Sequence, residues 1–269
     1  MATTINVKQV ENLGTPRSHE IRFPTSDNGL DQDEEWCQVL IDGQWEKVRF
    51  HEYDRIYDVP SLYEDLFYNT LQCSSPERVV RLLASVLEEQ EHGLESLRVL
   101  DVGAGNGIVG EELTKSGVPY IIGADIIPEA RRAALRDRPD VYDRYFVEDL
   151  CDLPEEKEKT LRSAKLNCLT TVAALGFGDI PPMAFLQAVD LIETPGWMAF
   201  NVKEEFLRES DSTGFSRLIR HLSREENIQI QAYWRYRHRL SLEGEPLYYV
   251  AVVARKLRDV SDELREAFR

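Results

Sequence analysis

Cysteine and histidine are scarce in this sequence, and neither residue type is arranged to bind a metal. The 269 residues include four cysteines, Cys37, Cys73, Cys151 and Cys168, and no two of them form a Cys-x-x-Cys pair. The five histidines show no ligand spacing either. We therefore expect reduced thiols, no disulfide framework and no metal site.

Long hydrophobic runs are also missing. A membrane-spanning helix needs about 20 consecutive apolar residues, whereas the longest apolar runs here, 172–178 and 248–254, have the length of a strand. The first residues lack the basic start and the apolar core of a signal peptide. These features predict a cytoplasmic protein that does not enter a membrane.

Positive charge is in deficit. The chain has 32 Lys and Arg residues against 48 Asp and Glu residues, which gives a formal net charge of -16. Proteins that bind nucleic acids or anionic membranes use basic patches to neutralise phosphates, so both partners are disfavoured. A hydrophobic content of 42% is ordinary for a globular protein, and the length allows one sizeable α/β domain with extensions or two small domains.

Residues 1–74 look like an extension that precedes the main domain. We expect an irregular arm over 1–35 with one strand at "HEIRF", then a hairpin over 36–50 that turns at Asp42-Gly43. The segment 51–71 is rich in tyrosine. Tyr53, Tyr57 and Tyr63 either pack on a core, as large aromatic rings usually do, or form a lid over a bound cofactor.

From residue 75 onward, strands and helices alternate. A helix over 74–92 is marked by Ser75 as its cap, by Pro76 in its first turn and by an apolar face. Apolar runs then predict strands, and amphipathic stretches predict the helices between them. The strands are expected at 97–102, 120–125, 144–149, 166–175 and 196–202, and the helices at 107–117, 128–138, 155–164 and 182–193.

The C-terminal part departs from this alternation. After a helix at 214–225, two strands at 227–241 and 245–256 are separated by the short turn 242–244. Strand–helix alternation produces parallel strands that helices cover, whereas a short turn produces an antiparallel pair. The sequence therefore predicts an α/β fold with a doubly wound, mostly parallel seven-stranded sheet, a C-terminal antiparallel hairpin and an N-terminal extension.

The stretch "LDVGAGNGIVG", 100–110, carries two overlapping glycine patterns. Asp101 followed by Gly103, Gly105 and Gly107 is an acidic residue before alternating glycines. Gly105-x-Gly107-x-x-Gly110 is the dinucleotide fingerprint, and Asp125 lies at the distance at which that fingerprint expects an acid. Both patterns follow a strand and open a helix, so both indicate a nucleotide-like ligand at the turn.

Three acids distinguish between the two kinds of cofactor. Asp125 closes the second parallel strand, where its carboxylate can accept hydrogen bonds from ribose hydroxyls of either cofactor. Asp101, before the first glycine, would repel a pyrophosphate and attract a cofactor with a sulfonium and an ammonium group; it can also brace the glycine turn. Asp149, after the third strand, is placed to accept the adenine amino group with Leu150 over the ring, or else it only caps a helix.

"LDVGAGNG", "GADIIPEA" and "VEDL", in this order and at these intervals, resemble the class I S-adenosylmethionine-dependent methyltransferases, a seven-stranded, Rossmann-like family. The resemblance covers about 97–257 and includes the terminal hairpin. It implies that Gly103, Ala104 and Gly105 approach the methionine part of S-adenosylmethionine. It also implies that Asp125 holds the ribose, that Ile126 lies against adenine, and that Asp149 and Leu150 meet the adenine edge. The domains are then 1–74, 75–257 (the methyltransferase domain) and a helical tail over 258–269.

The resemblance leaves the methyl acceptor open. Enzymes that methylate nucleic-acid adenine show an Asn/Asp-Pro-Pro-aromatic run after the fourth strand, whereas this chain has Asp179-Ile180-Pro181-Pro182 without the aromatic residue. A small-molecule acceptor is therefore favoured. No catalytic base is indicated; His238 is a candidate, but a structural role for it is favoured. The alternatives are an NAD-linked oxidoreductase and a non-catalytic S-adenosylmethionine-binding protein, and the sequence does not indicate the oligomeric state.

Overall fold

The computed structural model describes residues 18–24, 32, 34–176, 178–208 and 211–268. The chain divides into two compact units. The first comprises the residues up to Ser74 together with Arg237–Leu247, and the second comprises Ser75–Tyr236 and Tyr248–Arg269. The turn of the C-terminal hairpin thus groups with the N-terminal segment, which no local sequence pattern indicates.

The first unit contains a small antiparallel sheet in the order β1-β2-β3. Its strands are β1 (Ile21–Arg22), β2 (Trp36–Ile41) and β3 (Gln44–Arg49). Asp42 and Gly43 connect β2 to β3 and both have positive φ angles, 49° and 80°, as a two-residue hairpin turn requires. The helix α1 (Tyr53–Asp58) and the π-helix η1 (Glu64–Thr70) follow.

The three tyrosines for which a lid is an alternative lie in or against the core of the first unit. Tyr57 is buried, while Tyr53 and Tyr63 are partly buried against a cluster that includes Phe50 and Leu66. The rings also contact one another, with centroids 6.0 Å apart for Tyr53 and Tyr57 and 5.1 Å apart for Tyr57 and Tyr63. These contacts account for the tyrosines by packing, and a lid role stays a prediction.

Backbone and charge contacts join the hairpin turn to the rest of the first unit. The Leu240 N–H donates to the Leu71 carbonyl at 2.8 Å, and the Ser74 N–H donates to the His238 carbonyl at 2.9 Å. Arg239 is 3% exposed and forms an ion pair with Glu35, which is also buried. A buried ion pair is costly to break because the remaining charge is left without compensation.

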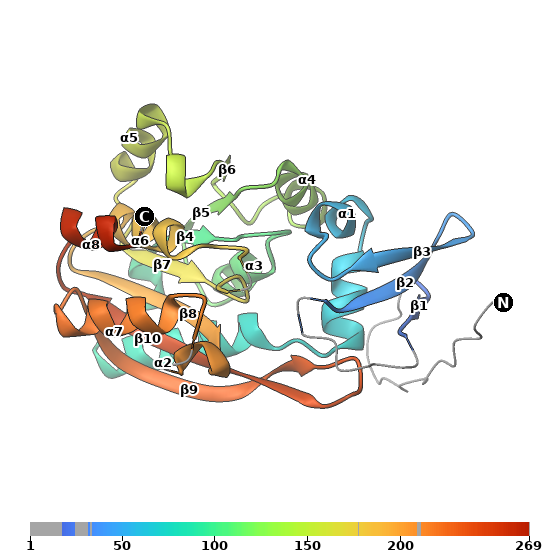
Figure 1. The fold of residues 1–269 in the computed structure, drawn as a ribbon. Helices are drawn as coiled ribbons and strands as arrows, with labels where there is room; N and C mark the ends of the chain where they lie inside the picture. Colours follow the sequence, from blue (N-terminus) through green and yellow to red (C-terminus); the bar gives the residue numbers. More distant parts are fainter. Residues whose placement is uncertain (1–17, 25–31, 33, 177, 209–210, 269) are drawn as a thin grey trace. The chain divides into compact units, whose positions relative to one another are not determined.

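The second unit is built around a seven-stranded sheet, which confirms the predicted fold class. The sheet order is β6-β5-β4-β7-β8-β10-β9, with β4, β5, β6, β7 and β8 parallel and β10 antiparallel to β8. Figure 1 shows helices on both faces of this sheet. The strands are β4 (Arg98–Val102), β5 (Tyr120–Asp125), β6 (Arg144–Val147), β7 (Cys168–Thr171), β8 (Gly196–Lys203), β9 (Ile228–Leu240) and β10 (Pro246–Lys256).

The helices of the second unit occur where the amphipathic stretches predict them. The α-helices are α2 (Ser75–Glu89), α3 (Ile108–Lys115), α4 (Pro128–Asp137), α5 (Glu155–Ser163), α6 (Pro182–Leu191), α7 (Phe215–Arg224) and α8 (Asp262–Ala267). Short 3-10 turns are η2 (Leu94–Ser96), η3 (Leu150–Asp152) and η4 (Glu204–Leu207). The order of the strands reverses direction between β4 and β7, and ligands of doubly wound sheets bind beyond the carboxyl ends of the strands at such a point.

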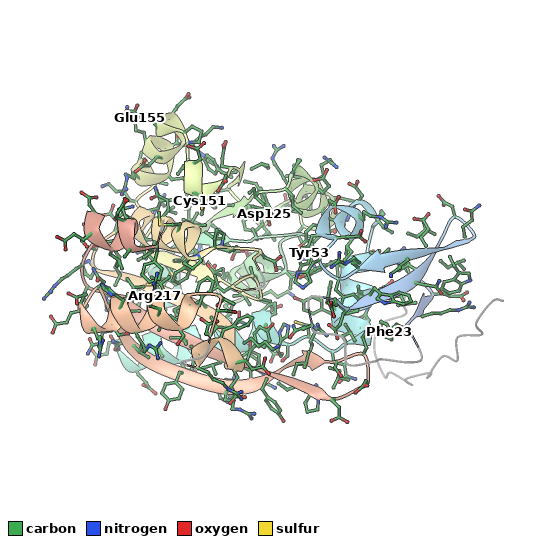
Figure 2. All side chains as sticks on the ribbon, viewed as in Figure 1. Phe23, Tyr53, Asp125, Cys151, Glu155 and Arg217 are labelled. Carbon is green, nitrogen blue, oxygen red and sulfur yellow. The ribbon has the colours of Figure 1, made fainter. Side chains whose placement is uncertain are left out.

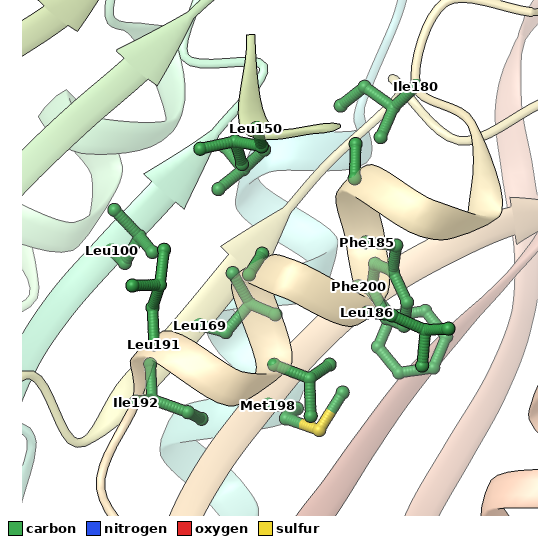
Figure 3. Close-up of a cluster of buried hydrophobic side chains, with 14 of the residues drawn as sticks. Leu100, Leu150, Leu169, Ile180, Phe185, Leu186, Leu191, Ile192, Met198 and Phe200 are labelled. Atoms are coloured by element: carbon green, nitrogen blue, oxygen red, sulfur yellow. The ribbon is translucent and has the colours of Figure 1, made fainter. Parts of the chain in front are cut away.

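Two hydrophobic clusters lie on the two faces of this sheet. One includes side chains of α5, α6 and α7, and the other includes side chains of α2 and α3. In the first cluster, Phe185 of α6 packs against Phe200 of β8 with ring centroids 5.3 Å apart, and Leu100 and Leu169 of the parallel strands belong to the same cluster (Figure 3). Each such side chain stabilises the fold by about 1.5–3 kcal/mol when it is fully buried.

Two local expectations are wrong. Ser75 does not precede α2 as a cap but is its first residue, and its hydroxyl group pairs with Tyr236 in the interior. The fourth parallel strand is shorter than expected, because it ends at Thr171 and Ala173 adopts a left-handed conformation with φ of 57°. A residue in this conformation cannot continue a strand, so the chain bends away directly after β7.

Gly110, the third glycine of the dinucleotide-like pattern, is a packing position inside α3. A Cβ atom at Gly110 would lie 2.5 Å from Cγ1 of Val141 and 2.8 Å from Cζ of Tyr142. Its absence therefore lets the helix approach the segment that precedes β6. The third glycine of the dinucleotide fingerprint also serves helix packing, so Gly110 by itself does not distinguish the two cofactors.

Gly110→Ala should therefore destabilise the protein, although the helix propensity of alanine is about 1 kcal/mol more favourable than that of glycine. We expect a loss of about 1–3 kcal/mol in the free energy of unfolding, because an added methyl group overpacks the contact. Urea unfolding followed by circular dichroism measures it. Ser85→Ala at an exposed position of α2 is the matched control; a Gly110→Ala protein as stable as that control would contradict the packing role.

Candidate functional site

The glycine turn between β4 and α3 is held by backbone bonds to the neighbouring strand. The N–H groups of Gly103 and Ala104 both donate to the Ala124 carbonyl, at 2.9 and 3.1 Å. Gly103, Gly105 and Gly107 have φ angles of 70°, 53° and 91°, a region in which other residues are strained. The sequence requires glycine here because the chain must reverse direction tightly before α3.

Asp125 ends β5 and fastens the middle of this turn (Figure 2). Its Oδ2 accepts the Gly105 N–H at 3.0 Å and its Oδ1 accepts the Ile127 N–H at 3.2 Å. Burial raises the pKa of the carboxyl group, while the bonds from these N–H groups lower it. Each carboxylate oxygen has a further lone pair, so the group can brace the turn and still accept a ligand hydroxyl.

Asp101 is placed beneath the turn rather than on the surface. It is 1% exposed, and its two oxygens accept hydrogen bonds from the hydroxyl groups of Tyr142 and Thr170, both at 2.7 Å. Burial raises its pKa to about 6, against the opposing effect of these two bonds. The partners observed for Asp101 are thus side-chain hydroxyls. Its influence on a ligand is that of a nearby charge, which is strong where water is excluded.

Two tyrosines that the sequence analysis did not single out complete the support of the turn. Tyr142 bonds to Asp101, and the Tyr145 hydroxyl donates to the Gly105 carbonyl at 2.8 Å. Their rings contact each other edge to face with centroids 5.3 Å apart. Gly123, directly opposite Tyr145 in the sheet, was the available signal, because a glycine inside a strand often marks a close approach of another group.

The predicted adenine-binding residues lie at the ends of β5 and β6. The Ile126 side chain follows Asp125 and is 58% exposed, which is unusual for an isoleucine. Asp149 precedes η3, and its Oδ1 accepts the Cys151 N–H at 2.8 Å, so it caps this turn. Leu150 is 7% exposed. Since β5 and β6 are paired neighbours, with Asp125 opposite Val147, these side chains belong to one edge of the sheet.

Asp179, in the loop that follows β7, is a further acid of this edge. It is exposed, and its charge raises the pKa of Asp125. Asp101 and Asp125 are likewise coupled, because the charge of Asp125 raises the pKa of Asp101. Asp101 on β4, Asp125 at the end of β5 and Asp179 in the loop after β7 therefore form one negative region around the glycine turn.

His238, the candidate base, belongs to the first unit. It is 5% exposed, and burial together with the charge of Arg239 holds the pKa of its imidazole well below the usual range. Its Nδ1 lies 3.8 Å from the Cys73 Sγ. A buried, neutral imidazole with these neighbours fits the structural role that the sequence favours.

Neither a metal centre nor a membrane segment is found in the part of the chain that the structure describes. No group of three or more His, Cys, Asp or Glu side chains among these residues is placed to hold a metal ion. No helix among them is long and apolar enough to cross a bilayer.

Comparison with known structures finds similar proteins at low sequence identity. Magnesium protoporphyrin IX methyltransferase from Synechocystis PCC 6803, solved with bound SAM, is 15% identical, with a TM-score of 0.47 over 67% of this chain and 79% of its own. An S-adenosylmethionine-dependent methyltransferase from Mesorhizobium loti is 16% identical, with a TM-score of 0.43 over 64% of this chain and 96% of its own. A search of curated protein sequences finds no significant match.

A sequence model of a protein family gives the decisive comparison. The model described as a methyltransferase domain matches residues 72–242. This match includes the glycine turn, the acids at the ends of β4, β5 and β6, and the start of the terminal hairpin, and it agrees with the observed seven-stranded sheet. The chain belongs to the class I, S-adenosylmethionine-dependent methyltransferases.

Proposed function

We propose that this protein transfers a methyl group from S-adenosylmethionine to a small-molecule acceptor. The observation that carries the proposal is the negative region around the glycine turn, where the charge of Asp125 acts on Asp101 and the charge of Asp179 acts on Asp125. Such a region favours a cofactor with a sulfonium and an ammonium group and disfavours the pyrophosphate of NAD.

The residues around the turn fit S-adenosylmethionine group by group. Gly103, Ala104 and Gly105 would lie along the methionine part, since backbone without large side chains permits a close approach. The carboxylate of Asp125 would accept hydrogen bonds from the ribose hydroxyls, and the exposed Ile126 offers an apolar surface to adenine. Asp149 and Leu150 would meet the adenine edge, although the Asp149 carboxylate also caps η3.

When bound, S-adenosylmethionine supplies an electrophilic methyl group, and the chain must align an acceptor with it. The net charge of -16 supports a small-molecule acceptor over a nucleic acid. The loop after β7 also supports it, because "DIPP" lacks the aromatic residue that base-methylating enzymes place there.

The first experiment compares S-adenosylmethionine, S-adenosylhomocysteine, NAD and NADP by thermal shift and calorimetry on the purified protein. A ligand that binds only the folded state raises the apparent stability. We expect stabilisation by the two sulfur compounds alone. Stabilisation by NAD would overturn the proposal, and binding without turnover in a broad acceptor screen would favour a non-catalytic cofactor-binding protein.

Asp125→Ala should weaken the binding of S-adenosylhomocysteine by about 1–3 kcal/mol, because the ribose hydroxyls and the Gly105 N–H lose their acceptor. Titration calorimetry measures this change. Asp152→Asn, an exposed position in η3, is the control and should bind as the unchanged protein does. Equal affinities for all three proteins would remove Asp125 from the ribose role.

The affinity for S-adenosylmethionine should depend on pH through Asp101. The pKa of this carboxyl group is raised to about 6, so the group is ionised above that pH and neutral below it. A cationic ligand favours the ionised form, and affinity should therefore rise by up to about 1.4 kcal/mol as the pH increases from 5 to 7.5.

Asp101→Asn provides the comparison for this pH profile, because asparagine keeps the shape of the side chain and one acceptor oxygen, offers an amide donor in place of the second acceptor, and has no charge. Calorimetric titrations of both proteins at several pH values isolate the contribution of Asp101 from that of Asp125. Parallel profiles for the two proteins would show that the charge of Asp101 does not act on the cofactor.

A further inference from the structure

A buried polar cluster on the α2 face of the sheet takes no direct part in the proposed cofactor site. It consists of Ser75 at the start of α2, Asn201 on β8 and Tyr236 on β9, which are 0%, 0% and 5% exposed. The Asn201 Nδ2 donates to the Tyr236 hydroxyl at 2.6 Å and to the Ser75 hydroxyl at 3.1 Å, and these two hydroxyls are 2.7 Å apart. Polar groups buried this deeply are retained only where they are satisfied.

The amide oxygen of Asn201 is directed at the end of β7. It accepts the Ala173 N–H at 2.6 Å. Ala173 is the residue with φ of 57°, at which the chain leaves the sheet. An alanine in the left-handed region is strained, and such a conformation persists where surrounding bonds hold it.

The loop that starts at this bend lies against the glycine turn. A Cβ atom on Gly103 would come within 2.7 Å of the Ala174 Cβ and 3.0 Å of the Ile180 Cδ1. The same loop carries Asp179, whose charge acts on Asp125. Ala173 is therefore the bend that leads into the loop whose Ala174 and Ile180 lie beside the turn.

This segment lies on one particular side of the cofactor. β5 and β6, which carry the proposed ribose and adenine residues, flank β4 on one side, whereas β7 flanks it on the other. If the adenosine half lies over β5 and β6, the half that bears the methyl group is nearer to the loop after β7. The acceptor must meet the methyl group on that side.

We infer that Asn201, supported by Tyr236 and Ser75, is a positioning residue of the methyltransferase that holds the bend at Ala173 and thereby aligns the loop after β7 with the methyl group. The inference rests on the proposed function. An amide suits this role because it accepts one bond from Ala173 and donates two to the hydroxyl pair. A leucine of similar size makes none of these bonds.

The test uses Asn201→Leu and the double variant Asn201→Leu/Ala173→Gly in the full chain. Glycine adopts positive φ angles without strain, so the second change should partly restore the bend without the asparagine. A loss of general packing in the core would not respond to a glycine at residue 173. Thr171→Val is the matched control, because the buried Thr171 hydroxyl has no partner among the described residues.

Three measurements are compared for each protein: hydrogen exchange of the peptide that covers 172–180, affinity for S-adenosylhomocysteine, and kcat with an acceptor found by screening. For Asn201→Leu we expect at least tenfold faster exchange and at least tenfold lower kcat, with cofactor affinity changed by less than about threefold. The double variant should recover a substantial part of kcat, and Thr171→Val should change none of the three.

Unchanged exchange in Asn201→Leu, or a reduced kcat that Ala173→Gly does not improve, would overturn the inference. Where Asn201→Leu does not fold, Tyr236→Phe replaces it. We then expect smaller changes of hydrogen exchange and kcat in the same directions, because the Asn201 amide loses one of its hydrogen-bond partners. If the unchanged protein does not bind S-adenosylhomocysteine, the proposed function fails. The exchange measurement alone then decides whether Asn201 holds the bend.

Discussion

The candidate site depends on how Gly105 is held. Its N–H donates to Asp125 on one neighbouring strand, and its carbonyl accepts the Tyr145 hydroxyl from the next strand along. A turn of glycines is otherwise the most flexible kind of backbone, and flexibility would have to be lost when a ligand binds. By fixing the turn from both sides in advance, the sheet reduces that cost. The same two bonds align the start of α3, whose free N–H groups face the turn.

The glycine turn encloses the carboxylate of Asp101, and the burial of this charge carries an energetic cost. Burial raises the pKa of this carboxyl group to about 6 in spite of bonds from Tyr142 and Thr170. A charge so poorly solvated disfavours the empty protein near neutral pH. A cationic ligand relieves part of this penalty, so the buried acid makes the site more selective for positive charge. Tyr142 and Thr170 donate hydrogen bonds to the carboxylate of Asp101 but leave its negative charge in place, whereas an arginine or lysine would neutralise that charge.

Most of the fold of the second unit can be read from the sequence, because its helices and strands are set by local periodicity and bounded by glycine and proline. The acids at the strand ends were visible for the same reason. Tyr142 and Tyr145 were missed because their partners, Asp101 and Gly105, lie about 40 residues earlier and are brought to them only by strand pairing. Ser75 was assigned to a local cap when its true partners are Tyr236 and Asn201, more than 120 residues away. Long-range polar contacts of this kind leave almost no local signal.

The glycines at the two ends of this motif differ in what each one contacts. Gly103 faces Ala174 and Ile180 of the loop after β7, whereas Gly110 faces Val141 and Tyr142. The first makes room for the segment that Asn201 positions, and the second makes room for the tyrosine that bonds to Asp101. Glycines that seem to form one motif therefore connect the turn to two different parts of the sheet. The proposed methyl transfer would use both connections, because the proposed ribose and adenine residues lie on the side of β5 and β6, whereas the acceptor is proposed to approach from the side of β7.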